Sequence, residues 1–232
     1  MGTDYIGNLV PVLRKSDFDD VATEFLQKYC PEALEKPMPV PIEYIARKMG
    51  LFVCTDYRLT EDFSVYGQIC FSSGIVDVYD KDEDEYREQF FRRGTILIDP
   101  DTILERNIGC FNNTVAHECV HWFKHRLYHF YNIEARNKIA VSARHFVRIQ
   151  DESSKSTWSD EDWMEWQANG IAPRILMPKK TFIEKFNQLK TSCSKFGKMI
   201  IELWIYDKLA NFFKVSKKSV KIRINELGLR LI

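Results

Sequence analysis

Four histidines stand four residues apart between positions 117 and 129. Residues at this spacing lie on one face of an α-helix, one turn above the next, so the segment is expected to be helical. The first two belong to the pentapeptide His117-Glu118-Cys119-Val120-His121. On a helix, His117 and His121 can direct both imidazoles at one Zn²⁺, and Glu118 can reach a water on that metal. The motif therefore predicts a catalytic zinc site with Glu118 as the base.

The histidine stripe leaves a choice of pair for the metal. His117 and His125 are about 12 Å apart along a helix axis, so three successive histidines cannot share one ion. A tryptophan follows His121 and an arginine follows His125, and neither can act as a base. Only the first pair has a carboxylate in the catalytic place, and we expect His125 and His129 on the helix face or in support of the ligands. The alternative to a metal site is an ordinary amphipathic helix with surface or core histidines.

A catalytic zinc needs a third protein ligand and an open position for water. Glu165 is the best candidate, because it shares a helix face with Ala168 and Asn169. The small alanine lets this helix approach the histidine helix, and Asn169 can hold a ligand in place by a hydrogen bond. Spacing alone does not exclude Glu161 or Asp162 as the third ligand.

Short segments rich in valine, isoleucine, phenylalanine and tyrosine precede the histidine helix. Separated by glycine and serine, they predict a small antiparallel sheet. These segments are 51–55, 63–71, 75–79 and 95–98. The charged run 80–93 is expected to be a solvated excursion between strands, and the polar run 132–158 a loop or loosely helical insertion.

Capping residues and helical spacing predict helices around this sheet. Asn112-Asn113-Thr114 is the expected start of the histidine helix, which would run from about Val115. The other expected helices are 16–30, 42–49, 159–177 and most of the chain beyond 178.

The net charge of zero conceals an asymmetry between the two ends of the 232-residue chain. From residue 179 onward, 13 lysines and arginines stand against four acids, and the preceding residues carry the balancing negative charge. We therefore divide the chain into a body, 1–178, and a basic helical tail, 179–232.

The tail resembles a helix-turn-helix, with Ser216 as the cap of its second helix. Four of its basic side chains can meet phosphates: Lys217, Lys218, Lys221 and Arg223. Packing of the tail against the body is favoured over direct nucleic-acid binding, and recruitment of a protein substrate is a third possibility.

Six cysteines are scattered along the chain without a C-x-x-C pair, which argues against a disulfide framework or a thiolate zinc knuckle. No export signal or membrane span is recognisable in the sequence. These features favour a cytoplasmic location, and the oligomeric state stays open.

Two sequence blocks resemble the ImmA/IrrE family of metallopeptidases. The first is Thr114-Val-Ala-His117-Glu118-Cys-Val-His121. The second follows the family pattern Glu-x-x-Ala-Asn-x-Phe-Ala-x-x-Leu-Leu-Met-Pro, of which this chain keeps Glu165, Ala168, Asn169, Ala172, Leu176, Met177 and Pro178. Segments 41–50 and 98–99 are also similar to the family, so that the likeness covers most of residues 37–228. The departures are Val120 before the second histidine, Pro173 inside the second helix and a long gap between His121 and Glu165.

The resemblance implies an α+β, zincin-like fold that is mainly helical, with a small antiparallel sheet and a helix-turn-helix-like C-terminal tail. It implies a zinc metallo-endopeptidase with His117, His121 and Glu165 as ligands and Glu118 as base. Its substrate would be a protein, namely a helix-turn-helix transcriptional repressor of a mobile element or stress response. The alternatives are a non-catalytic DNA-binding regulator with a structural or vestigial metal site, and a zinc hydrolase of small molecules.

Overall fold

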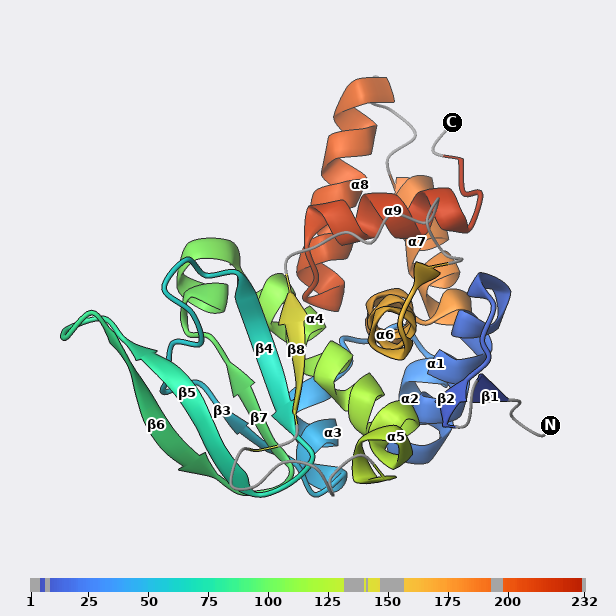
Figure 1. Ribbon diagram of the computed structural model, residues 1–232. Helices are drawn as coiled ribbons and strands as arrows, with labels where there is room; N and C mark the ends of the chain where they lie inside the picture. The colour runs from blue at the N-terminus through green and yellow to red at the C-terminus, as the bar shows by residue number, and fades with distance from the viewer. Residues whose placement is uncertain are drawn as a thin grey trace.

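The computed structural model describes residues 5–6, 9–131, 140, 142–146, 157–192 and 198–230 (Figure 1). A helical path through the middle of the molecule separates a β-rich side from a helical side. The C-terminal helices lie above the helical side in this view.

The central path comprises three consecutive helical segments. They are α4 (Ile108–Val120), the π-helical segment η3 (His121–His125) and α5 (Arg126–Tyr131). The predicted start near Val115 is wrong, because Asn107 caps the helix earlier: its side-chain oxygen accepts a hydrogen bond from the Cys110 amide at 3.0 Å. Thr114 lies inside the helix, where its hydroxyl donates to the Cys110 carbonyl one turn back.

The main sheet packs on one side of α4. It has four strands in the order β3 (Phe52–Cys54), β7 (Thr95–Ile98), β4 (Val65–Cys70) and β8 (Ser142–Phe146). β4 is antiparallel to both of its neighbours, but β3 and β7 are parallel, so the sheet is mixed rather than purely antiparallel. β8 lies in the run expected to be a loop or loose helix. It forms a strand because pairing with β4 satisfies the backbone groups on the edge that faces β4.

A separate hairpin extends from the sheet side (Figure 1). Its strands are β5 (Gly74–Asp80) and β6 (Glu85–Phe91), paired in register over their full lengths. The expected solvated excursion at 80–93 is therefore mostly a strand. Its charged side chains face solvent and pair with one another, as Arg87 does with Asp80 at 2.7 Å. Hydrogen bonds between β5 and β6 stabilise the strand although its side chains are polar. The periodicity of the sequence does not reveal such pairing.

The helical side holds β1 (Tyr5–Ile6), β2 (Val10–Pro11), η1 (Lys15–Asp17), α1 (Phe18–Tyr29), α2 (Glu32–Glu35) and the long helix α6 (Asp160–Leu176). α3 (Ile42–Lys48) packs against α4 and β3, and the π-helical segment η2 (Thr102–Arg106) follows β7 on the β-rich side (Figure 1). Ser159 caps α6 reciprocally with Asp162. Pro173 lies within α6, which runs on to Leu176.

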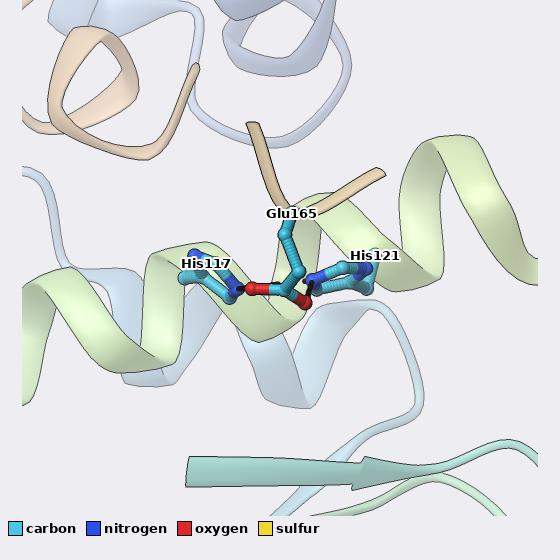
Figure 2. Close-up of side chains that lie close together, drawn as sticks. All are labelled: His117, His121 and Glu165. Atoms are coloured by element: carbon cyan, nitrogen blue, oxygen red, sulfur yellow. Dashed lines mark hydrogen bonds and ion pairs between the residues drawn. The ribbon is translucent and has the colours of Figure 1, made fainter. Parts of the chain in front are cut away.

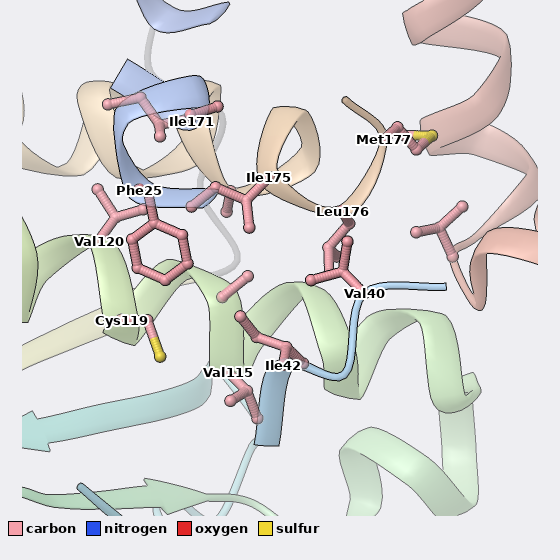
Figure 3. Packing of buried hydrophobic residues seen from close by; sticks show 14 of the residues in the cluster. Phe25, Val40, Ile42, Val115, Cys119, Val120, Ile171, Ile175, Leu176 and Met177 are labelled. Atoms are coloured by element: carbon pink, nitrogen blue, oxygen red, sulfur yellow. The ribbon is translucent and has the colours of Figure 1, made fainter. Parts of the chain in front are cut away.

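One apolar core joins α4 to α6 and α1. Its members include Val115 and Val120 of α4 and Ile171 and Ile175 of α6, each fully buried, with Phe25 of α1 (Figure 3). This packing holds the two helices that carry the motif residues against each other, so the hydrophobic effect fixes their relative position.

The C-terminal helices are α7 (Lys179–Ser192), α8 (Lys198–Phe213) and α9 (Lys217–Glu226). Leu209, Phe213, Val220 and Ile224 from these helices belong to the same core cluster as the residues of α4 and α6. The division at residue 178 stays a prediction, and apolar packing connects the two parts.

Arg223 does not face solvent as a phosphate ligand would. Its side chain is 1% exposed, pairs with Asp19 of α1 and donates to the Met177 carbonyl at 3.2 Å. Across the described ranges, no helix is both long and apolar enough to cross a membrane. The fold is α+β, as the sequence predicts.

Candidate metal centre

Three side chains from two helical paths converge at the middle of the molecule (Figure 2). His117 and His121 project from the central path, and Glu165 reaches them from α6. The two Nε2 atoms are 2.9 Å apart. The Glu165 carboxylate lies 3.2 Å from Nε2 of His117 and 2.9 Å from Nε2 of His121. The structure thus brings together His117, His121 and the candidate third ligand Glu165.

The three side chains are largely buried, and their protonation states favour binding of a cation. His117 and His121 are buried, and the Glu165 side chain is 19% exposed. Burial lowers the pKa of His117, which keeps a lone pair available on its ring. Burial also tends to raise the pKa of Glu165, but the two imidazoles outweigh it and hold that pKa well below its usual range.

The donor set fits a zinc ion. Two imidazole nitrogens and one carboxylate are a common set of protein ligands at catalytic zinc. Donors about 2.1 Å from a tetrahedral ion lie about 3.4 Å from one another. The observed separations of 2.9–3.2 Å are within a few tenths of an ångström of that value. Ring nitrogens facing each other this closely need a proton or a cation between them, which these ligands are placed to share.

Glu118 lies beside this cluster as a buried carboxylate. It is 0% exposed, and neither of its oxygens has a hydrogen-bond partner among the described residues. Burial, with a smaller contribution from Glu165, raises the pKa of Glu118 well above its ordinary value. A buried carboxyl without a hydrogen-bond partner is costly, which points to a group that binds in the site and meets Glu118.

Gly67 of β4 is a position that the sequence interpretation missed. A Cβ atom there would lie 2.5 Å from Cγ2 of Thr114 and 3.1 Å from Oε1 of Glu118. The strand can therefore pass directly beneath the histidine helix only where a side chain is absent. The available signal was a glycine inside an apolar strand, which often marks close approach of the backbone to another group.

The remaining candidates fall into two groups. Asn169 acts on His117 by raising its pKa against the larger, lowering effect of burial, and His125 contacts His121. The other candidates lie outside the cluster. His129 stacks on Phe71 with ring centroids 4.0 Å apart, Asp162 is occupied in the cap of α6, and Glu161 is exposed.

An α+β fold with two helical histidines, an acid beside the first of them and a carboxylate from a second helix defines a zincin-like metallopeptidase. The family model described as the IrrE N-terminal-like domain, peptidase M78, matches residues 72–225. The chain belongs to this family, which indicates a metallopeptidase-type function. No curated protein matches the chain.

Proposed function

We propose that the protein is a zinc-dependent endopeptidase in which His117, His121 and Glu165 hold the metal and Glu118 is the general base. The observation that carries this proposal is the convergence of the three donors next to a buried carboxylate without a partner. A structural metal site has no use for such a carboxylate, whereas hydrolysis requires a group that accepts a proton from water.

Each residue has a distinct part in the proposed reaction. A zinc ion held by His117, His121 and Glu165 would supply Lewis acidity toward the scissile carbonyl and would lower the pKa of water. Glu118 takes the proton of the attacking water on its carboxylate and delivers it to the leaving amine. His117, His121 and Glu165 orient the metal, and the surrounding apolar core excludes bulk water from Glu118.

We further propose that the protein is cytoplasmic and that its substrate is a protein, namely a helix-turn-helix repressor of a mobile element or stress response. Support comes from the resemblance of both motif blocks to the ImmA/IrrE family. The proposal assigns no DNA contact to the tail. In support, Arg223 is buried and Lys217 pairs with Asp207 at 2.8 Å, which leaves fewer cations for phosphates.

The test is co-expression with a candidate helix-turn-helix repressor from the same genetic neighbourhood. The parent and the variant Glu118→Gln would be compared for repressor cleavage and for bound zinc. We expect cleavage by the parent only, with similar zinc content in both proteins. Glu161→Gln is the matched control, because Glu161 is an exposed acid one turn before Glu165 on the same helix.

The outcomes separate the competing functions. Equal behaviour of the parent and Glu118→Gln, together with tight and salt-sensitive DNA binding, would replace the peptidase by a DNA-binding regulator. Turnover of a small amide substrate without cleavage of any protein would instead indicate a small-molecule hydrolase.

A further inference from the structure

A buried chain of hydrogen bonds leads away from the proposed metal ligand His121. The Nδ1 atom of His121, on the side of the ring opposite the metal position, lies 3.1 Å from Nδ1 of His125. Nε2 of His125 lies 3.1 Å from Oε1 of Gln167, and the Gln167 amide donates to the Pro11 carbonyl at 2.7 Å. His125 and Gln167 are 0% exposed and His121 is 1% exposed, so these groups depend on one another for hydrogen bonds.

The backbone carbonyl at the far end sets the direction of every bond in this chain. The Pro11 oxygen can only accept, so the NH₂ group of Gln167 faces it and the Gln167 oxygen faces His125. That oxygen can also only accept, so Nε2 of His125 carries a proton. An imidazolium here would be a buried charge whose hydrogen bonds reach only a ring nitrogen and an amide, which is costly. His125 is therefore neutral, and its Nδ1 is an acceptor.

The hydrogen-bond directions also determine which ring nitrogen of His121 carries the proton. Because Nδ1 of His125 accepts, the hydrogen on Nδ1 of His121 is the donor between the two rings. The proton of a neutral His121 then lies on the nitrogen away from Glu165, and the Nε2 lone pair points at the site. A zinc ligand needs this tautomer.

The local backbone explains how two histidines four residues apart can meet ring to ring. His121 to His125 form the π-helical segment η3. Helical residues four apart lie on one face, one turn above the other, as His117 and His121 also do, so the two rings can meet. The partner Gln167 comes from α6, two residues after Glu165, and Pro11 comes from β2 at the start of the chain.

We propose that His125 and Gln167, anchored on the Pro11 carbonyl, are positioning residues that fix the tautomer and ring orientation of His121. They need not touch substrate. The inference rests on the proposed function in one respect only, namely that His121 binds the metal. It extends the site from the three ligands to the N-terminal strand β2, outside the segment that matches the family model.

The direct experiment is nitrogen NMR of the histidine rings in ¹⁵N-histidine-labelled protein, both metal-free and zinc-loaded. We expect the proton of His125 on Nε2 and a proton on Nδ1 of His121 in both forms. A proton on Nδ1 of His125 would overturn the proposal. This measurement needs no variant and no activity, so it decides the proton arrangement even if the protein proves not to be a peptidase.

A second experiment measures zinc affinity by competition with a chelating dye. Gln167→Met keeps the side-chain length but removes both hydrogen bonds, and we expect zinc affinity to fall by about 10- to 100-fold. His129→Phe is the matched control, since His129 belongs to the same stripe but packs on Phe71, and zinc affinity should be unchanged. A folded Gln167→Met with parental affinity would overturn the proposal. Failure of the parent itself to bind zinc would count against the proposed function, and the ring-nitrogen spectra would still decide the hydrogen-bond chain.

Discussion

At the scale of single residues, the site depends on two positions that differ in how visible they are in the sequence. Glu118 is conspicuous, because an acid directly after the first of two spaced histidines has a known chemical use. Gly67 is inconspicuous, although β4 can lie against Thr114 and Glu118 only because it lacks a Cβ atom there. A motif reveals the groups that react, whereas a glycine inside a strand signals a close approach without identifying the neighbour, which the contacts identify.

Gly67→Ala tests this close approach. The added methyl would lie 2.5 Å from the Thr114 side chain, so the strand and the helix must separate. We expect a loss of about 1–3 kcal/mol in the free energy of unfolding and a lower kcat, because Glu118 moves with its helix. Urea denaturation and peptide hydrolysis would measure the two effects, and parental values of both would contradict the contact.

The raised pKa of Glu118 predicts how the stability of the metal-free protein depends on pH. The pKa of Glu118 in the folded state lies well above the ordinary value of 4.5, first because of burial. The folded state therefore holds the proton more tightly than the unfolded state, and the stability of the parent falls as pH rises from about 4.5 through the folded-state pKa. Glu118→Gln lacks this titration. Its melting temperature should exceed that of the parent by an amount that grows from pH 5 to pH 8, and a difference independent of pH would refute the expectation.

At the scale of elements, the contact between α1 and α6 places Glu165. Gly170 of α6 lies against the ring of Phe18, where a Cβ atom would be 2.1 Å from the nearest ring carbon.

The helix pattern predicted α6 because its cap and spacing are local properties. The sequence did not predict the start of α4, because Asn107 precedes a segment without strong helical periodicity. It did not predict the strand β6 either, because hydrogen bonds to β5, rather than local sequence, stabilise that strand.

Gly170→Ala sets two effects against each other. Alanine is favoured over glycine inside a helix by about 1 kcal/mol, whereas overpacking costs about 1–3 kcal/mol. Since the obstructing group is a buried ring, we expect a net loss of stability and weaker zinc binding as Glu165 shifts. Adding Phe18→Leu should recover part of the loss in a double-mutant cycle of unfolding free energies, and strictly additive effects would exclude the contact.

At the scale of the whole molecule, a partly buried ion pair joins α9 to α1. Arg223 of α9 pairs with Asp19 of α1, while Arg174 of α6 pairs with Glu226 of α9 at 3.0 Å. Part of the positive charge of the tail, that of Arg223, is therefore buried against the body rather than exposed to solvent. A count of charges cannot separate an arginine that bridges helices from a lysine in solvent, because both contribute equally to the net charge.

Arg223→Met should destabilise the protein by about 2–4 kcal/mol, less than the most costly broken pairs because Asp19 remains 27% exposed. The substitution also leaves the Met177 carbonyl without its guanidinium donor. Lys221→Met is the control, as an exposed position on the same helix where a change within about 0.5 kcal/mol is expected. Equal stability of the two variants would show that the bridge contributes nothing.

The sequence by itself determined the reactive groups, because histidines four apart, an adjacent acid and a capped second helix follow from local periodicity. The tertiary structure decided which of the nearby acids meets the histidines: Glu165 reaches them, and Glu161 and Asp162 do not. It also decided that the four histidines separate into two that meet Glu165, one that contacts His121 and one that stacks on Phe71. Such choices depend on which surfaces pack together, and packing joins residues such as Pro11 and Gln167, 156 positions apart.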